Sequence, residues 1–135
     1  MYYFAYATNL NKQQIALISP QIRPLYTATL HNYRLVFTGW TRQWRGGTAT
    51  IKRSDRDKVF GAIYDVPEED WRKLDRAENC PGEYERIRVI VNNEDGDATE
   101  AVTYIKKDLV RAEESKPSPE YLALIQQGYK DWRLV

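Results

Sequence analysis

The chain has 135 residues, of which 42% are hydrophobic and 29% are charged, and its net charge is +1. This length suits a single domain, residues 1–135, with one hydrophobic core, and the composition is that of a globular protein rather than a disordered segment. The near balance of 20 Lys and Arg against 19 Asp and Glu gives no overall attraction to nucleic acid or to an anionic membrane, so we expect neither as a partner.

The first half of the chain predicts mainly strands. Tyr2–Tyr6 is an aromatic-rich run typical of a strand, and Asn9 or Asn11 is expected to cap a short helix over residues 12–18. The further predicted elements are a loop bracketed by Pro20 and Pro24, strands over residues 27–30, 33–38, 48–51 and 58–66, a turn at His31-Asn32 and a turn or bulge at residues 45–47.

The second half predicts two helices and a hairpin. Pro67 opens a helix, and helical spacing places Trp71, Leu74 and Ala77 on its core face. The remaining predicted elements are strands over residues 84–91 and 99–105 joined by a turn at 92–97, a polar loop over 106–117, and a helix from Ser118-Pro119 to about Gly128.

The order of these elements indicates the fold class. Six or seven strands and about three short helices occur without regular alternation, which predicts an α+β domain rather than a parallel α/β sheet. We expect a small mixed or antiparallel sheet that is closed or strongly curled, like a barrel, with short helices beside it. Ten Tyr and four Trp further indicate a pocket or an interface lined by aromatic side chains.

Metal and nucleophile chemistry is weakly supported. One His and one Cys, His31 and Cys80, cannot form a structural zinc site, although a carboxylate-only magnesium site stays open. A Cys–His nucleophile pair is formally available, but His31 is better explained as a surface residue of a turn. A single cysteine, short apolar runs and a start without a secretory pattern predict a cytoplasmic protein without an internal disulfide.

A nucleic-acid site is a second alternative. Residues 40–45 mix Trp and Arg, and Lys52, Arg53 and Arg56 follow, a composition found in sites for single strands. The neutral charge of the whole chain argues against this interpretation.

Glu78 is the strongest catalytic candidate. It follows Leu74 by four residues and Trp71 by seven, so it lies at the edge of the predicted core face, and Pro81-Gly82 then turns the chain into the next strand. A partly desolvated carboxylate has a raised pKa and suits proton transfer. The alternative is a salt bridge at the periphery.

Several separated stretches resemble the gamma-glutamylcyclotransferase-like family. Residues 3–10 (YFAYATNL) are similar to its Tyr-Gly-Ser-Asn-Leu signature, and residues 74–78 (LDRAE), with Tyr84 six residues on, are similar to the segment that holds its catalytic glutamate. Residues 46–51 and 59–64 resemble its glycine-pair strand and its valine-aromatic-glycine strand, and residues 116–121 resemble its Pro-Ser-Pro-x-Tyr element.

The resemblance implies a small closed sheet with short helices and a cyclisation that converts a γ-glutamyl amino acid or amine to 5-oxoproline plus a free amine, without a cofactor or a metal. It makes Glu78 the general acid/base and the small-molecule γ-glutamyl substrate the partner of a monomer or homodimer. The implied substrate-binding residues are Tyr6, Ala7, Thr8, Asn9, Leu10, Tyr84 and Tyr121.

Three departures from the family pattern bear on activity: Ala7 and Asn79 stand where glycine is usual, and Thr8 where serine is usual. A Cβ at position 7 is unfavourable if the backbone must approach a ligand closely or adopt a positive φ. The alternative hypothesis is therefore a non-catalytic protein of the same fold that binds a γ-glutamyl compound. The identity of the leaving amine stays open.

Overall fold

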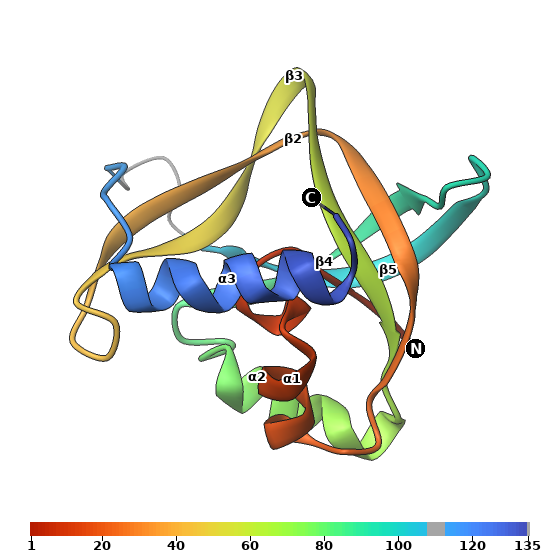
Figure 1. Cartoon of the computed structure of the whole chain (residues 1–135), viewed down its shortest axis with the longest axis horizontal. Helices are drawn as coiled ribbons and strands as arrows, with labels where there is room; N and C mark the ends of the chain where they lie inside the picture. The colour runs from red at the N-terminus through yellow and green to blue at the C-terminus, as the bar shows by residue number, and fades with distance from the viewer. Residues whose placement is uncertain (108–112, 135) are drawn as a thin grey trace.

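Two long antiparallel strands form the frame of the fold in this computed structural model, which describes residues 1–107 and 113–134 (Figure 1). They are β2 (Arg23–Thr41) and β3 (Gly46–Asp65). β1 (Tyr2–Ala5) pairs antiparallel with β3 and parallel with β5 (Ala98–Lys106), and β4 (Tyr84–Asn92) pairs with both β5 and β2. The sheet thereby closes into a barrel in the order β1-β3-β2-β4-β5. The predicted α+β class with a closed mixed sheet is confirmed.

The structure joins the four central strands predicted from the sequence into β2 and β3. The turn predicted at His31-Asn32 is wrong: His31 lies within β2, and Asn32 has a φ of 66° where the register with β3 shifts. Asparagine tolerates the left-handed region, so a bulge can bend the strand without ending it. The turn before Thr48 also lies earlier than expected, since Gly46 already opens β3 and residues 42–45 make the turn.

Pro24 also lies in a strand, so the predicted loop ends before it. Pro24 pairs with Tyr64 in the second position of β2, and the register shifts between Pro24 and Tyr26. Proline is tolerated there because it stands at the start of a strand, next to an irregularity.

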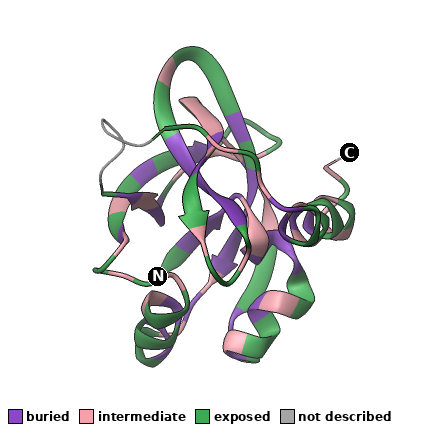
Figure 2. Ribbon diagram, turned by 90° about the vertical axis from the view of Figure 1, so that its left-hand side faces the viewer, coloured by how far each residue is buried: buried purple, intermediate pink, exposed green. Residues whose placement is uncertain are grey.

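Alternate residues of β1 enter two hydrophobic clusters, which explains why its sequence is apolar throughout. Tyr3 and Ala5 belong to a cluster with Ile15 and Leu74 of the helices, whereas Phe4 packs into the other cluster. Successive side chains of a strand point to opposite faces, so a strand covered on both faces reads as a continuous apolar run. Figure 2 shows the buried residues concentrated on the strands and on the inner sides of the helices.

The first two helices lie side by side below the barrel (Figure 1). α1 (Lys12–Ile18) is capped by Asn11, whose side chain accepts a hydrogen bond from the Gln14 amide at 3.0 Å. The helix predicted at Pro67 is a 3₁₀ turn, η2 (Glu68–Asp70), followed by α2 (Trp71–Ala77). The prediction that Ala77 faces the core is wrong, because Ala77 is exposed at the end of the helix.

α3 (Pro119–Asp131) crosses the front of the barrel in Figure 1 and begins at the predicted cap, Ser118. Its predicted end at Gly128 is wrong, since the helix continues for three residues. A Cβ on Gly128 would lie 2.6 Å from the Asn11 amide nitrogen and 2.6 Å from the Leu10 Cβ. Gly128 therefore allows α3 to approach residues 10 and 11 closely and does not terminate the helix.

The predicted polar loop over 106–117 falls partly on residues 108–112, which lie outside the described residues. None of the helices in residues 1–107 and 113–134 is long and apolar enough to cross a bilayer.

Candidate functional site

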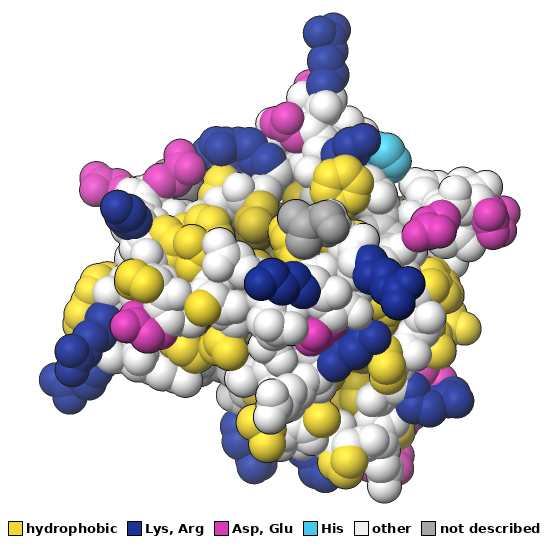
Figure 3. Space-filling view, viewed as in Figure 1, with side chains coloured by type: hydrophobic (Ala, Val, Ile, Leu, Met, Phe, Trp, Pro, Cys, Tyr) yellow, Lys and Arg dark blue, Asp and Glu magenta, His cyan; other side chains and the backbone are white. Residues whose placement is uncertain are grey.

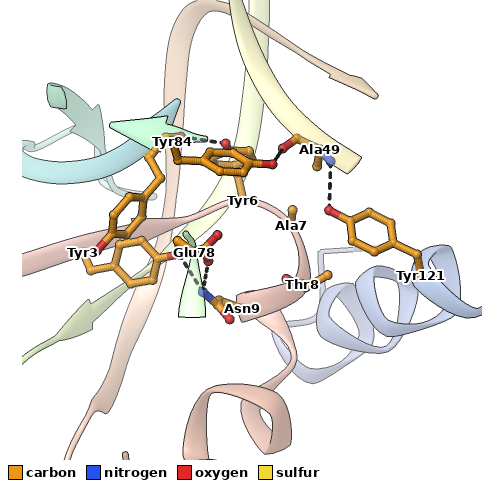
Figure 4. Close-up of a pocket in the computed structure, with 10 residues that line it drawn as sticks. Tyr3, Tyr6, Ala7, Thr8, Asn9, Ala49, Glu78, Tyr84 and Tyr121 are labelled. Carbon is orange, nitrogen blue, oxygen red and sulfur yellow. Dashed lines mark hydrogen bonds between the residues drawn. The ribbon is translucent and has the colours of Figure 1, made fainter. Parts of the chain in front are cut away.

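A small pocket lies where the segment after β1 meets the end of α2 and the start of α3 (Figure 4). Its volume of about 30 Å³ has room for about two water molecules. Five of the ten lining residues are tyrosines, as the tyrosine-rich composition suggested. The pocket is lined by Tyr3, Tyr6, Ala7, Thr8, Asn9, Ala49, Glu78, Tyr84, Tyr104 and Tyr121.

Hydrogen bonds to its backbone carbonyls hold the segment after β1 in place. Residues Thr8–Leu10 form the 3₁₀ turn η1, and the Tyr64 hydroxyl donates to the Asn9 carbonyl oxygen at 2.8 Å. The Trp132 indole donates to the Leu10 carbonyl oxygen at 2.9 Å. The Leu10 side chain is fully buried in the hydrophobic core and does not line the pocket. Leu10 therefore anchors the turn, whereas Ala7, Thr8 and Asn9 face the space above it.

Glu78 is the C-cap of α2, directly after Ala77, and the chain reverses immediately after it. The Asn79 amide donates to the Arg76 carbonyl and the Cys80 amide to the Asp75 carbonyl, the pair of bonds that defines a Schellman cap. This cap requires a left-handed residue, and Asn79 has a φ of 53°. Glycine fits this position without strain and asparagine fits it better than other residues, so Asn79 preserves the backbone that aims Glu78.

The Glu78 carboxylate is hydrogen-bonded to the η1 turn. Asn9 Nδ2 donates to Glu78 Oε1 at 2.6 Å and also to the Tyr3 hydroxyl oxygen at 2.9 Å (Figure 4). Burial raises the pKa of Glu78 to about 7, the Asn9 hydrogen bond opposes this shift, and the negative charge of Glu83 adds to it. Glu78 can therefore both accept and donate a proton near neutral pH.

The predicted tyrosines form the walls of the pocket. The Tyr84 hydroxyl donates to the Ala49 carbonyl oxygen at 2.6 Å, and the Tyr121 hydroxyl accepts from the Ala49 amide at 2.8 Å. The Tyr6 hydroxyl donates to the Tyr104 carbonyl oxygen at 2.7 Å. Burial is the main cause that raises the pKa values of Tyr6, Tyr84 and Tyr121, and the nearby Glu78 carboxylate adds to it, so all three remain neutral phenols at physiological pH.

A second, larger cavity of about 310 Å³ adjoins the pocket. We call the two the inner pocket and the outer cavity. They share the walls formed by Thr8, Asn9, Glu78, Tyr84 and Tyr121. The other residues lining the outer cavity are Gln14, Ile18, Thr41, Gln43, Trp44, Thr48, Ala77, Asn79 and Glu83.

The structure brings together seven of the eight residues that the sequence singled out, all except the side chain of Leu10. The sequence interpretation missed Tyr3, Tyr104 and Ala49, which lie on three different strands. It also did not assign to this site the residues that line the outer cavity alone, although three of them lie in the 40–45 stretch considered for nucleic acid. The tyrosine content was the one signal available for Tyr3 and Tyr104, because neither position differs in sequence pattern from an ordinary strand residue.

The alternative sites considered above lie elsewhere or merge with this one. His31 is exposed in β2, Cys80 is half-buried after α2, and neither lines the inner pocket or the outer cavity. Trp44 packs edge-on against Tyr121, with ring centres 5.1 Å apart, and lines the outer cavity, whereas Trp40 is exposed. Within the described residues no group of three His, Cys, Asp or Glu side chains could hold a metal ion. Figure 3 shows Lys and Arg spread over the viewed face among apolar and acidic side chains.

The sequence matches the family model described as gamma-glutamyl cyclotransferase, AIG2-like, over residues 3–133. Gamma-glutamylcyclotransferase of Homo sapiens is 33% identical over 134 residues, which cover 96% of this chain and 70% of that protein, and the Bos taurus protein is 32% identical with the same coverage. A solved structure of a gamma-glutamyl cyclotransferase superimposes with a TM-score of 0.93 at 29% identity, covering 99% of this chain and 80% of that one. An uncharacterized protein from Homo sapiens gives a TM-score of 0.92 at 30% identity, covering 98% and 80% of the two chains.

Proposed function

The chain belongs to the gamma-glutamyl cyclotransferase, AIG2-like family, and we propose that it converts a γ-glutamyl compound to 5-oxoproline and a free amine, with Glu78 as the general acid/base. The observation that carries this proposal is the position of Glu78, a half-buried carboxylate with a pKa of about 7 that faces the η1 turn across the inner pocket. A pKa near the working pH is what general acid–base catalysis needs. An ordinary glutamate, with a pKa of about 4.3, would be a weak base at neutral pH.

The reaction is an intramolecular acyl transfer. The α-amine nitrogen of the glutamyl group bonds to its own γ-carbonyl carbon, the bond from that carbon to the leaving nitrogen breaks, and the ring of 5-oxoproline forms. The α-ammonium first gives one proton to solvent to become the attacking amine, the Glu78 carboxylate then takes the second proton that this nitrogen loses as the ring closes, and Glu78 passes that proton to the leaving nitrogen. No oxidant, reductant or co-reactant enters this balance.

Positioning accounts for the remaining catalysis. Holding the amine and the carbonyl in near-attack geometry supplies up to about 7–11 kcal/mol of the barrier in ideal cases. The amide groups of Thr8 and Asn9 open the η1 turn, so they have no acceptor within it and are suited to hold the substrate carboxylate or the developing oxyanion. Tyr84 and Tyr121 form the wall of both cavities, so a glutamyl group too large for the inner pocket alone still contacts them.

The test is the release of 5-oxoproline from a panel of γ-glutamyl peptides and γ-glutamylamines. We expect Glu78→Gln to lower this release about 10²- to 10⁴-fold, because the amide keeps the shape of the side chain but does not act as an acid or a base near neutral pH. Glu85→Gln is the control, since Glu85 is exposed on β4 and lines neither cavity. Near-wild-type release by Glu78→Gln would remove Glu78 from this role.

A non-catalytic binding protein of the same fold is the second candidate, and the methyl group that Ala7 adds to the inner pocket is the observation that favours it. This candidate predicts calorimetric binding of γ-glutamyl compounds without turnover across the whole panel. The negative φ of Ala7, −137°, favours the enzyme, since the residue does not need the left-handed conformation that glycine provides. We further propose that the protein acts in the cytoplasm, because its single cysteine suits a reducing compartment.

A further inference from the structure

We propose that the outer cavity is the subsite for the leaving amine, that it selects amines bearing a second positive charge, and that Glu83 is the residue that recognises this charge. The inference rests on the proposed function and names its substrate class: a γ-glutamyl group on one nitrogen of a diamine. It makes Glu83 a specificity-determining residue rather than a catalytic one.

The walls that the two cavities share indicate where the leaving group would lie. Glu78 lines both of them, and it must lie beside the nitrogen to which it returns a proton. With the glutamyl group against the η1 turn, filling the inner pocket and the adjoining part of the outer cavity, the rest of the substrate extends past Glu78 into the remainder of the outer cavity. The volume of about 310 Å³ gives an alkyl amine the room that the inner pocket lacks.

The charges that line the outer cavity have one sign. Among the residues that line the outer cavity in the described part of the chain, Glu78 and Glu83 are the two whose side chains can carry a charge at neutral pH. None of these lining residues is Lys, Arg or His. Trp44, Tyr84 and Tyr121 supply aromatic walls. A carboxylate beside aromatic faces attracts an alkylammonium ion through both Coulomb and cation–π interactions.

Glu83 remains available to a ligand although Lys106 lies near it. The Lys106 ammonium is 3.7 Å from Glu83 Oε1 and donates shorter hydrogen bonds to Thr38 and Thr48. The Lys106 side chain is 8% exposed and does not line the cavity, whereas the Glu83 side chain is 38% exposed and does. Among residues 1–107 and 113–134 the Lys106 ammonium is the partner of the Glu83 carboxylate, and their separation of 3.7 Å is longer than a normal hydrogen bond. A ligand in the cavity therefore meets the carboxylate rather than the ammonium.

The same arrangement disfavours γ-glutamyl amino acids. Their leaving group carries a carboxylate on the carbon next to the leaving nitrogen, so this negative charge would enter a cavity that already holds Glu78 and Glu83. Like charges brought together in a partly desolvated site repel, and the lining residues described offer no cation to offset them.

Three substrates of matched length test the proposal by kcat/KM: γ-glutamyl-1,4-diaminobutane, γ-glutamylbutylamine and γ-glutamylnorvaline. We expect the diamine compound to exceed the butylamine compound about fivefold, the effect of one charge pair at a half-exposed site, and the norvaline compound to be the poorest. The diamine advantage should appear in KM and should shrink as salt is added.

Two variants assign the effect to Glu83. Glu83→Gln should remove most of the diamine advantage, measured as the ratio of kcat/KM for the diamine compound to that for the butylamine compound at the pH optimum of each variant, because Glu83 also acts on the pKa of Glu78. Glu85→Gln, which alters an exposed carboxylate two residues away, should leave the ranking unchanged. Gln43→Lys places a cation on the exposed rim of the cavity and should raise kcat/KM for the norvaline compound relative to kcat/KM for the diamine compound. This variant provides an independent test if Glu83→Gln fails to fold.

The outcomes separate this inference from the proposed function. Release of 5-oxoproline from all three compounds with norvaline equal to or better than the diamine would overturn the inference and leave the proposed function standing. An undiminished diamine advantage in Glu83→Gln would also overturn the role of Glu83. Release from no compound would overturn the proposed function and this inference with it.

Discussion

Asn9 and Glu78 are 69 positions apart in the sequence and share a hydrogen bond of 2.6 Å across the inner pocket. The bond joins the turn after the first strand to the end of α2, so the position of the turn and the pKa of the carboxylate are coupled. Burial raises this pKa and Asn9 lowers it, because the amide donor favours the charged form.

The first prediction concerns the pH profile. The kcat/KM of the wild type should rise with pH through about 7 as Glu78 loses its proton. Asn9→Ala should move this rise to higher pH by about one unit, because the carboxylate loses a hydrogen bond. Asn92→Ala, far from the pocket in the β4–β5 hairpin, is the control with the same substrate. An unmoved profile in Asn9→Ala would break the link between Asn9 and Glu78.

The second prediction concerns stability and needs no substrate. The folded-state pKa of Glu78, about 7, lies above its unfolded value, so the folded protein holds this proton more tightly and loses stability as pH rises from about 4.5 to 7. Glu78→Gln removes this loss of stability at high pH, because glutamine does not ionise. Its free energy of unfolding should exceed that of the wild type by about 2 kcal/mol at pH 8, and the difference should disappear near pH 4. Urea unfolding at both pH values measures this, and an equal difference at the two would refute it.

The third prediction concerns the Schellman cap. Asn79→Gly should keep or slightly increase stability and activity, because glycine adopts a φ near 53° freely. Asn79→Ala should lower the free energy of unfolding by about 1 kcal/mol, because alanine has a penalty in the left-handed region. The comparison of the two variants by thermal unfolding isolates the backbone effect. Equal stability of the two would show that the cap does not depend on this conformation.

The fourth prediction concerns Gly128. On an exposed helix Gly→Ala is stabilising, but here the new Cβ would meet the backbone of Asn11 and the side chain of Leu10 at 2.6 Å. We expect Gly128→Ala to destabilise the fold by about 1–3 kcal/mol and to reduce turnover by displacing the η1 turn. Gln126→Ala, an exposed position of α3, should change stability by less than about 0.5 kcal/mol. A stabilising Gly128→Ala would contradict this account.

The fold class and much of the site could be predicted from the sequence, because local patterns and the family resemblance agreed. The Asn11 cap, the Ser118 cap and the alternation in β4 are local features, and each was predictable. The separate roles of two asparagines were not predictable from the sequence: Asn11 caps α1, whereas Asn9 faces Glu78. Which one takes which role depends on where α2 ends, and that is a tertiary relationship.

The outer cavity could not be predicted from the sequence either, because it too depends on tertiary contacts. Gln43 and Trp44 come from the turn between β2 and β3, whereas Glu83 comes from the segment before β4. They meet only once the barrel has closed. The bulge at Asn32 was also misread, since an asparagine with positive φ serves a bend in a strand as readily as a turn.

The closure of the barrel also sets an order of events during folding. β1 completes the sheet through a parallel pairing of Tyr3 with Val102, nearly one hundred residues later, and the inner pocket needs Tyr121 from α3 as its last wall. Contacts of such long range form slowly, because a long loop must close before they form. A chain emerging from the ribosome thus carries residues 8–10 from the start but has no complete inner pocket until α3 has been made. We expect a chain truncated before Tyr121 to lack one wall of the inner pocket, so that Glu78 would be more solvated and its pKa closer to that of an ordinary glutamate.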